Sequence, residues 1–130
     1  FPVLSSYAGT GTQSLSMINF NVDSDVSSAF FVKKKRYVAS AGLVKVALDG
    51  NEIGKLGVGE MERVNIEPGS HTARVTISNL LQAGIGGDAV AFNAEKGKAY
   101  YFIVDYDQGL FTGKWSITET SKNGFTKALN

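Results

Sequence analysis

Apolar and polar residues alternate over most of the chain, and a period of two is the pattern of a β-strand with one buried face. Residues 29–32 (AFFV) are instead continuously apolar, which is typical of a strand buried on both faces. These patterns predict strands over 15–22, 29–32, 43–48, 53–56, 61–66, 71–78, 89–94, 99–104 and 114–119. No stretch between them has the period of a helix.

Turn residues separate the predicted strands. Asp49-Gly50 lies between two apolar runs and predicts a hairpin, because Asp and Gly tolerate the positive φ of such turns. Pro68-Gly69 has the residue order of a type II turn. The sequence therefore predicts an all-β chain, folded as a single antiparallel β-sandwich of about seven to nine strands, immunoglobulin-like or prealbumin-like in outline.

The length of 130 residues suits one compact domain. Residues 5–14 are small and polar without periodicity, so we expect a flexible N-terminal lead-in over 1–14. The sandwich is expected over 15–120, and a loose C-terminal tail over 121–130. Because the sequence begins at Phe1 and not at a methionine, we expect a mature or trimmed form.

Composition narrows the classes of function. Lys and Arg number 13 against 12 Asp and Glu, so a net charge of +1 gives no bulk electrostatic argument for nucleic acid or an anionic membrane. The chain has no cysteine, which excludes a disulfide scaffold, a thiolate zinc site and a cysteine nucleophile. It has no run of about 18 apolar residues that would cross a bilayer, and no cofactor is expected.

The order of several turn motifs points to a family. The AFFV strand is followed by VKVALDGNEIGKL, a short strand, EPGSHTARV and, after a loop, AFNAEKGKAYYFIVD. This order resembles the PEGA-like, immunoglobulin-like domains of unknown function found in bacterial exported lipoproteins. The resemblance covers residues 29–105 and is carried by Asp49, Gly50, Ile53, Gly54, Pro68, Gly69, His71, Gly97, Tyr100 and Tyr101.

The resemblance implies a β-sandwich, an extracytoplasmic location and, in many such proteins, an N-terminal lipid on a cysteine. It implies no enzymatic activity. This chain departs from the family in lacking that cysteine, which would lie upstream of Phe1, and in having KKKRY at 33–37 where a Tyr-Arg pair is frequent.

His71 is the one histidine and the candidate for a general base. Its place at a strand start, just after the Pro-Gly turn, favours instead a side chain that hydrogen-bonds the adjacent turn. The acidic residues within 21–25 and 105–107 have the spacing of calcium ligands. Neither segment continues into the Gly and distal Glu of a calcium loop, so we favour structural turns at both places. No metal site is expected.

The only charge run is a candidate binding surface. It consists of Lys33, Lys34, Lys35 and Arg36 and suits phosphate or lipid headgroups. The alternative is a solvated strand end that discourages edge-to-edge pairing, for which lysines are a usual device.

Aromatic residues near the C-terminal end are a second candidate. Tyr106, Phe111 and Trp115 flank a glycine-containing turn, and aromatic side chains exposed on loops are typical of binding surfaces. The alternative is ordinary packing in the core. The glycine-rich segment 79–88 is the third candidate and is expected to be a mobile loop.

These observations favour a non-catalytic, exported interaction or structural module, periplasmic or associated with the cell envelope, whose partner is an envelope protein or the cell wall. A nucleic acid partner is not expected, and membrane contact is expected only through an upstream lipid anchor. The main alternative is a carrier of a small apolar ligand held between the sheets near 79–88. A hydrolase built on His71 and self-assembly through an edge strand are further alternatives.

Overall fold

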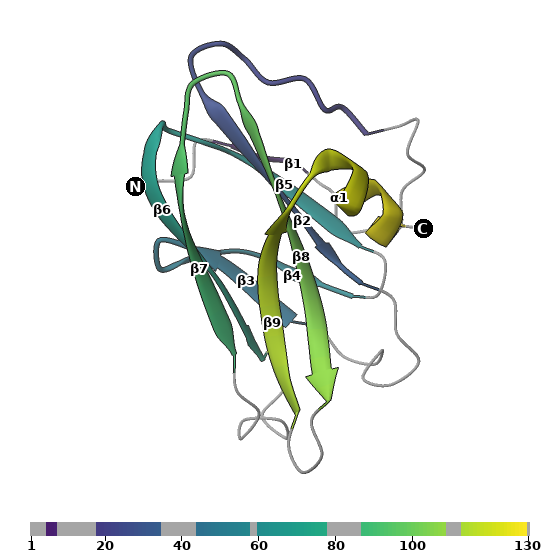
Figure 1. Ribbon diagram of the computed structural model, residues 1–130. Coiled ribbons are helices and arrows are strands. Elements are labelled where there is room, and N and C mark those ends of the chain that lie inside the picture. The colour runs from purple at the N-terminus through teal and green to yellow at the C-terminus, as the bar shows by residue number, and fades with distance from the viewer. Residues whose placement is uncertain are drawn as a thin grey trace.

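The computed structural model describes residues 5–7, 18–34, 44–57, 60–77, 87–108 and 113–129. They form two packed sheets, with strand orders β1-β5-β2-β8-β9 and β4-β3-β6-β7 (Figure 1). The predicted all-β sandwich is therefore confirmed. The elements are β1 (Ser5–Tyr7), β2 (Ser27–Lys33), β3 (Val44–Leu48), β4 (Asn51–Leu56), β5 (Met61–Ile66), β6 (Gly69–Ile77), β7 (Asp88–Ala94), β8 (Ala99–Gln108), β9 (Gly113–Thr120) and α1 (Lys122–Leu129).

One pair of neighbouring strands is parallel, whereas the other described pairs are antiparallel. β2 and β8 run in the same direction, with Phe31 opposite Phe102. Parallel neighbours need a long connection, and here the chain passes through β3 to β7 before it returns in β8. This parallel pair is an exception within an otherwise antiparallel sandwich.

The inner faces of the two sheets meet over an apolar core. Its side chains come from alternate positions of each strand, as expected for sheets packed face to face. This inner core contains Ala29, Phe31, Val64, Ile66, Phe102, Val104, Trp115 and Ile117 from the five-stranded sheet, and Val44, Val46, Leu48, Leu56, Ala73, Val75, Phe92 and Ala94 from the four-stranded sheet.

The five-stranded sheet is covered on its outer face as well. Phe30 and Val32 of β2 pack there against Phe125, Ala128 and Leu129 of α1. The Phe30 and Phe125 rings meet edge to face at a centroid distance of 5.8 Å. Because both faces of this sheet are covered, every side chain of β2 is buried, which confirms the prediction from its continuous apolar run.

The loose tail expected over 121–130 is wrong, because residues 122–129 form α1, which lies on the outer face of the five-stranded sheet (Figure 1). Ser121 begins the helix, since its Oγ accepts a hydrogen bond from the Gly124 amide at 3.1 Å. A helix this short is marginal on its own in water. Tertiary packing of its buried face, centred on Phe125, therefore holds it in place.

The strand predicted over 15–22 is wrong for the described residues 18–22, which form no strand. Phe20 packs against the core beneath α1. The carbonyl oxygens of Asn19 and Asn21 accept hydrogen bonds from the Arg63 guanidinium of β5. A side chain thus satisfies backbone groups that a neighbouring strand would otherwise pair.

The lead-in expected over 1–14 contains a short strand. β1 pairs antiparallel with β5 along the edge of the five-stranded sheet, with Ser6 opposite Val64. The expectation of a flexible segment is therefore corrected over 5–7. The rest of 1–14 lies outside the described residues.

The predicted hairpin at Asp49-Gly50 joins β3 to β4. Asp49 has φ 50° and Gly50 has φ 86°, so both central residues take the positive φ that a tight hairpin turn requires. Gly69 follows Pro68 with φ 129°, a value that side chains strongly disfavour. The hairpin predicted at Asp49-Gly50 is therefore confirmed, and Gly69 has a backbone conformation that favours glycine.

The connections gather at two ends of the sandwich. The turn end holds the β3–β4, β5–β6 and β7–β8 connections. At the opposite end, which we call the loop end, β2, β4, β6 and β8 finish and β3, β5, β7 and β9 begin. The registers place these strand ends together, since Val44 is opposite both Leu56 and Ile77, and Gln108 is opposite Gly113.

Candidate functional site

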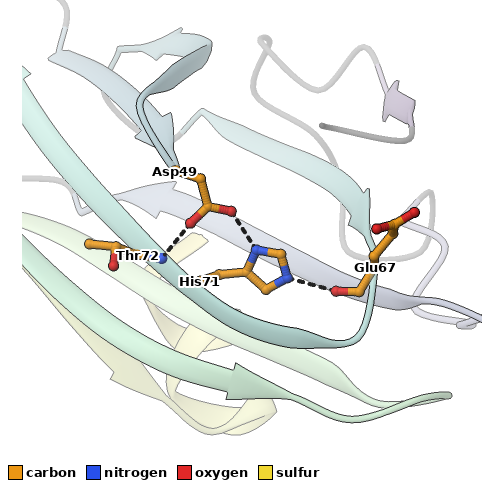
Figure 2. A network of polar contacts seen from close by, with 4 residues as sticks. All are labelled: Asp49, Glu67, His71 and Thr72. Atoms are coloured by element: carbon orange, nitrogen blue, oxygen red, sulfur yellow. Dashed lines mark hydrogen bonds and ion pairs between the residues drawn. The ribbon is translucent and has the colours of Figure 1, made fainter. Parts of the chain in front are cut away.

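A polar network around His71 joins two turns at the turn end (Figure 2). His71 Nδ1 lies 2.5 Å from Asp49 Oδ2, and Nε2 lies 2.6 Å from the carbonyl oxygen of Glu67. The other carboxylate oxygen, Asp49 Oδ1, accepts a hydrogen bond from the Thr72 amide at 2.8 Å. The network ties the β3–β4 turn and the β5–β6 turn to β6.

Both ring nitrogens of His71 face acceptors. The Asp49 carboxylate lies at Nδ1 and the Glu67 carbonyl oxygen lies at Nε2, so both nitrogens are occupied by groups of the protein itself. The ring is buried and packs on Phe92, with ring centroids 5.7 Å apart. A general base needs a nitrogen that reaches the substrate, whereas both nitrogens here are engaged inside the fold. The interpretation that His71 hydrogen-bonds the adjacent turn is confirmed, and Asp49 is a partner that the sequence did not reveal.

The network changes the acidity of Asp49. Burial by itself raises the pKa of this carboxyl, but hydrogen bonds from His71 and the Thr72 amide, together with the charge of His71, outweigh burial and leave the pKa below its ordinary value. The carboxylate form is therefore the one that the folded protein stabilises.

We expect Asp49→Asn to lower the free energy of unfolding, and the loss to depend on pH. A lowered pKa in the folded state adds stability above the unfolded pKa of about 3.9, and that stability disappears as pH falls through the folded pKa. Urea unfolding of both proteins from neutral to acid pH measures the difference. The free energies of unfolding of the two proteins should become equal at the acid end of the range. A difference between them that stays constant down to the lowest pH would contradict the assigned charge of Asp49.

A hollow of about 380 Å³ adjoins the network. It lies over the outer face of β6 and β7, because its exposed lining side chains point away from the inner core. Its lining is Asp49, Ser70, His71, Thr72, Ala91, Phe92 and Asn93. Short hydroxyl and amide side chains dominate the exposed part of this lining.

The basic run begins inside the fold. Lys33 is 1% exposed, and its ammonium lies 5.0 Å from the centre of the Trp115 ring. Burial lowers the pKa of Lys33, and the charge of Glu60 partly opposes that shift. The alternation of β2 places position 33 on the inner face with Phe31. Lys33 is therefore corrected from an exposed binding residue to a buried one.

The next residue of the basic run differs from Lys33 in exposure. Lys34 is exposed, and its backbone amide donates to the Val104 carbonyl oxygen at 2.9 Å, which fixes its position beside β8. Lys35 and Arg36 lie outside the described residues. Of the four basic candidates, the structure thus presents Lys34 to solvent.

The aromatic candidates pack against each other. Trp115 is 3% exposed in the inner core, so it is corrected from an exposed binding residue, and ordinary packing is what the structure shows. Tyr106 is partly exposed and meets the Trp115 ring edge to face at 5.2 Å. Phe111 lies outside the described residues.

Strand topology places the described strand ends next to the three sequence-predicted surfaces at the same end of the sandwich. Lys34 follows β2, Tyr106 is near the end of β8, and the segment 79–88 connects β6 to β7. All of these strand ends belong to the loop end. Residues 79–86 lie outside the described residues, and Asp88 begins β7.

The turn predicted for the acidic segment 105–107 is wrong, because Asp105 and Asp107 lie within β8, opposite Ser116 and Lys114 of β9. The segment 21–25 does contain a turn. The Val26 amide donates to the Asp23 carbonyl oxygen, which closes the turn before β2. Within the described part of the chain, no three His, Asp or Glu residues gather closely enough to hold a metal ion.

Comparisons of the chain with protein-family models, with curated proteins and with solved structures found no match. None of the described helices is long and apolar enough to cross a bilayer.

Proposed function

We propose that this chain is a non-catalytic interaction or structural module of the cell envelope and that it binds its partner at the loop end. The observation that carries the proposal is the convergence of strand ends. Connections between strands carry binding residues when a rigid scaffold presents them together, and β2, β6 and β8 all finish at this end of the sandwich. The partner is an envelope protein or the cell wall.

The His71 network supports a module without catalysis. The one histidine has both ring nitrogens engaged by Asp49 and Glu67. Other residues that carry the family resemblance also act in turns, since Gly50, Gly69 and Gly97 all have positive φ. These motif residues are thus explained by the backbone they shape, without any chemistry.

Export to the envelope rests on the resemblance to domains of exported lipoproteins. An upstream lipid anchor would hold the chain at a membrane, and the described fold adds no spanning helix of its own. The carrier alternative has less support, because packed side chains fill the interior between the sheets. The described hollow lies at the turn end, on the outer face of β6 and β7 and not between the sheets.

Charge reversal at Lys34 should reduce binding to envelope material. Lys34 is exposed at the loop end, and mutating a rim charge weakens association without disturbing the fold. In cosedimentation with envelope and peptidoglycan preparations from the source cells, we expect Lys34→Glu to lower the bound fraction about fivefold or more.

Lys96→Glu is the matched control, because it makes the same charge change on an exposed residue at the turn end. It should bind like the unaltered protein. Equal loss in both variants would indicate a nonspecific charge effect and reject the loop end as the binding surface. Undiminished binding of Lys34→Glu would reject it as well.

A further inference from the structure

The outer face of the four-stranded sheet gathers positive charge. Lys45 on β3 and Lys55 on β4 stand directly opposite each other, and Arg74 projects from the adjoining strand β6. Lys55 and Arg74 are exposed, and Lys45 is partly exposed. None of these cations forms an ion pair within the described part of the chain.

This arrangement costs stability, because like charges directly opposite each other destabilise a sheet. Arg74 lies opposite Ala47 and is therefore diagonal to Lys45, at a separation of about 7–8 Å. Ala89 lies on the far side of Arg74, so short side chains flank the cations and leave them open to a ligand. Glu52 is an acid on the same face: it lies opposite Ala47 and is therefore diagonal to Lys45, but it is two strands away from Arg74.

The hollow at the turn end lies on this same face. Thr72, which lines it, is two residues from Arg74 along β6, a rise of about 7 Å. Ser70 and Asn93 add a hydroxyl and an amide to the lining. Groups that both donate and accept hydrogen bonds suit the hydroxyl groups of a sugar ring.

We propose that this face binds an acidic glycan, with sugar hydroxyls in the hollow and carboxylates on Arg74, Lys45 and Lys55. Guanidinium and carboxylate make strong, paired hydrogen bonds. The hydroxyl-lined hollow favours a glycan over an anion without sugar rings, which would use the cations alone. The proposal concerns a different surface from the loop end and stands whether or not the loop end binds a partner.

Titration calorimetry with a short oligogalacturonate tests this site, with maltohexaose as the neutral sugar and polyphosphate as the anion without hydroxyl-bearing rings. The unaltered protein should bind oligogalacturonate, bind maltohexaose far more weakly, and lose affinity as salt rises. Arg74→Glu should weaken oligogalacturonate binding about tenfold or more. Lys96→Glu, with the same charge change outside this face, should leave it unchanged.

The hollow has its own test. The double variant Ser70→Ala/Thr72→Val removes two hydroxyls and should weaken oligogalacturonate binding about fivefold, while polyphosphate binding stays as it was. Thr118→Val removes an exposed hydroxyl from β9 of the other sheet and should have no effect. The proposal is overturned if oligogalacturonate does not bind, if Arg74→Glu binds it equally well, or if the double variant loses nothing.

Discussion

Phe31→Ala is expected to lower the free energy of unfolding by about 3–5 kcal/mol, the usual range for a fully buried phenylalanine. Phe31 is 0% exposed and lies at the centre of the inner core. Its ring stacks on Phe102 across the parallel pair, with centroids 5.1 Å apart. Truncation leaves a cavity between two sheets that cannot close over it.

Urea unfolding followed by Trp115 fluorescence and circular dichroism measures this loss. Phe31→Leu is the matched control, because it keeps most of the apolar volume and should cost less than about 1.5 kcal/mol. A loss below about 1 kcal/mol for Phe31→Ala would contradict the packing of the two sheets through this residue.

Arg63→Met is expected to lower the free energy of unfolding by about 2–3 kcal/mol, since it removes charged hydrogen bonds but keeps most of the side-chain volume. Arg63 is buried, and its guanidinium donates to the carbonyl oxygens of Asn19 and Asn21 and to Ser28 Oγ. It also stacks over the Phe30 ring at 4.9 Å. Without the guanidinium, residues 18–22 lose the contacts that fasten them to the sheet.

Hydrogen exchange distinguishes this fastening role from a general loss of stability. Amides of 18–22 should exchange faster in Arg63→Met than global unfolding accounts for. Arg74→Met is the control, because Arg74 is exposed and forms no ion pair in the described part of the chain. Its effect on stability should stay within about 0.5 kcal/mol. Equal effects of the two variants would contradict the account of Arg63.

The strands were predictable because their evidence is local. The alternation of β3 and the Asp49-Gly50 turn predict a hairpin within one stretch of sequence. The continuous apolar run at 29–32 predicts a strand that is buried on both faces. The same alternation places Lys33 on the inner face with Phe31, so its burial was readable from the pattern. Its charge and its position at a strand end favoured the opposite interpretation.

The features that sequence reasoning missed depend on distant contacts. α1 contains Gly124 and has weak intrinsic helix formers, so its stability comes from packing against β2 and β8. The segment 18–22 has the alternation of a strand, but Arg63 takes the place of a neighbouring strand.

The candidate site was only partly predictable. The turn contact of His71 follows from its place beside Pro68-Gly69, whereas its pairing with Asp49 requires the β3–β6 register. The outer cations Lys45, Lys55 and Arg74 are scattered in sequence, and only strand pairing brings them to one face. The gathering of the binding candidates at the loop end likewise follows from strand order, which no local pattern encodes.

Site-specific photocrosslinking in the source cells tests the proposed envelope module most directly. A photoreactive amino acid replaces Lys34 at the loop end or Lys96 at the turn end, both of which are exposed. The account predicts an adduct with an envelope component from position 34, recovered in the envelope fraction, and none from position 96. No adduct from position 34, equal adducts from both positions, or recovery of the protein outside the envelope fraction would contradict it.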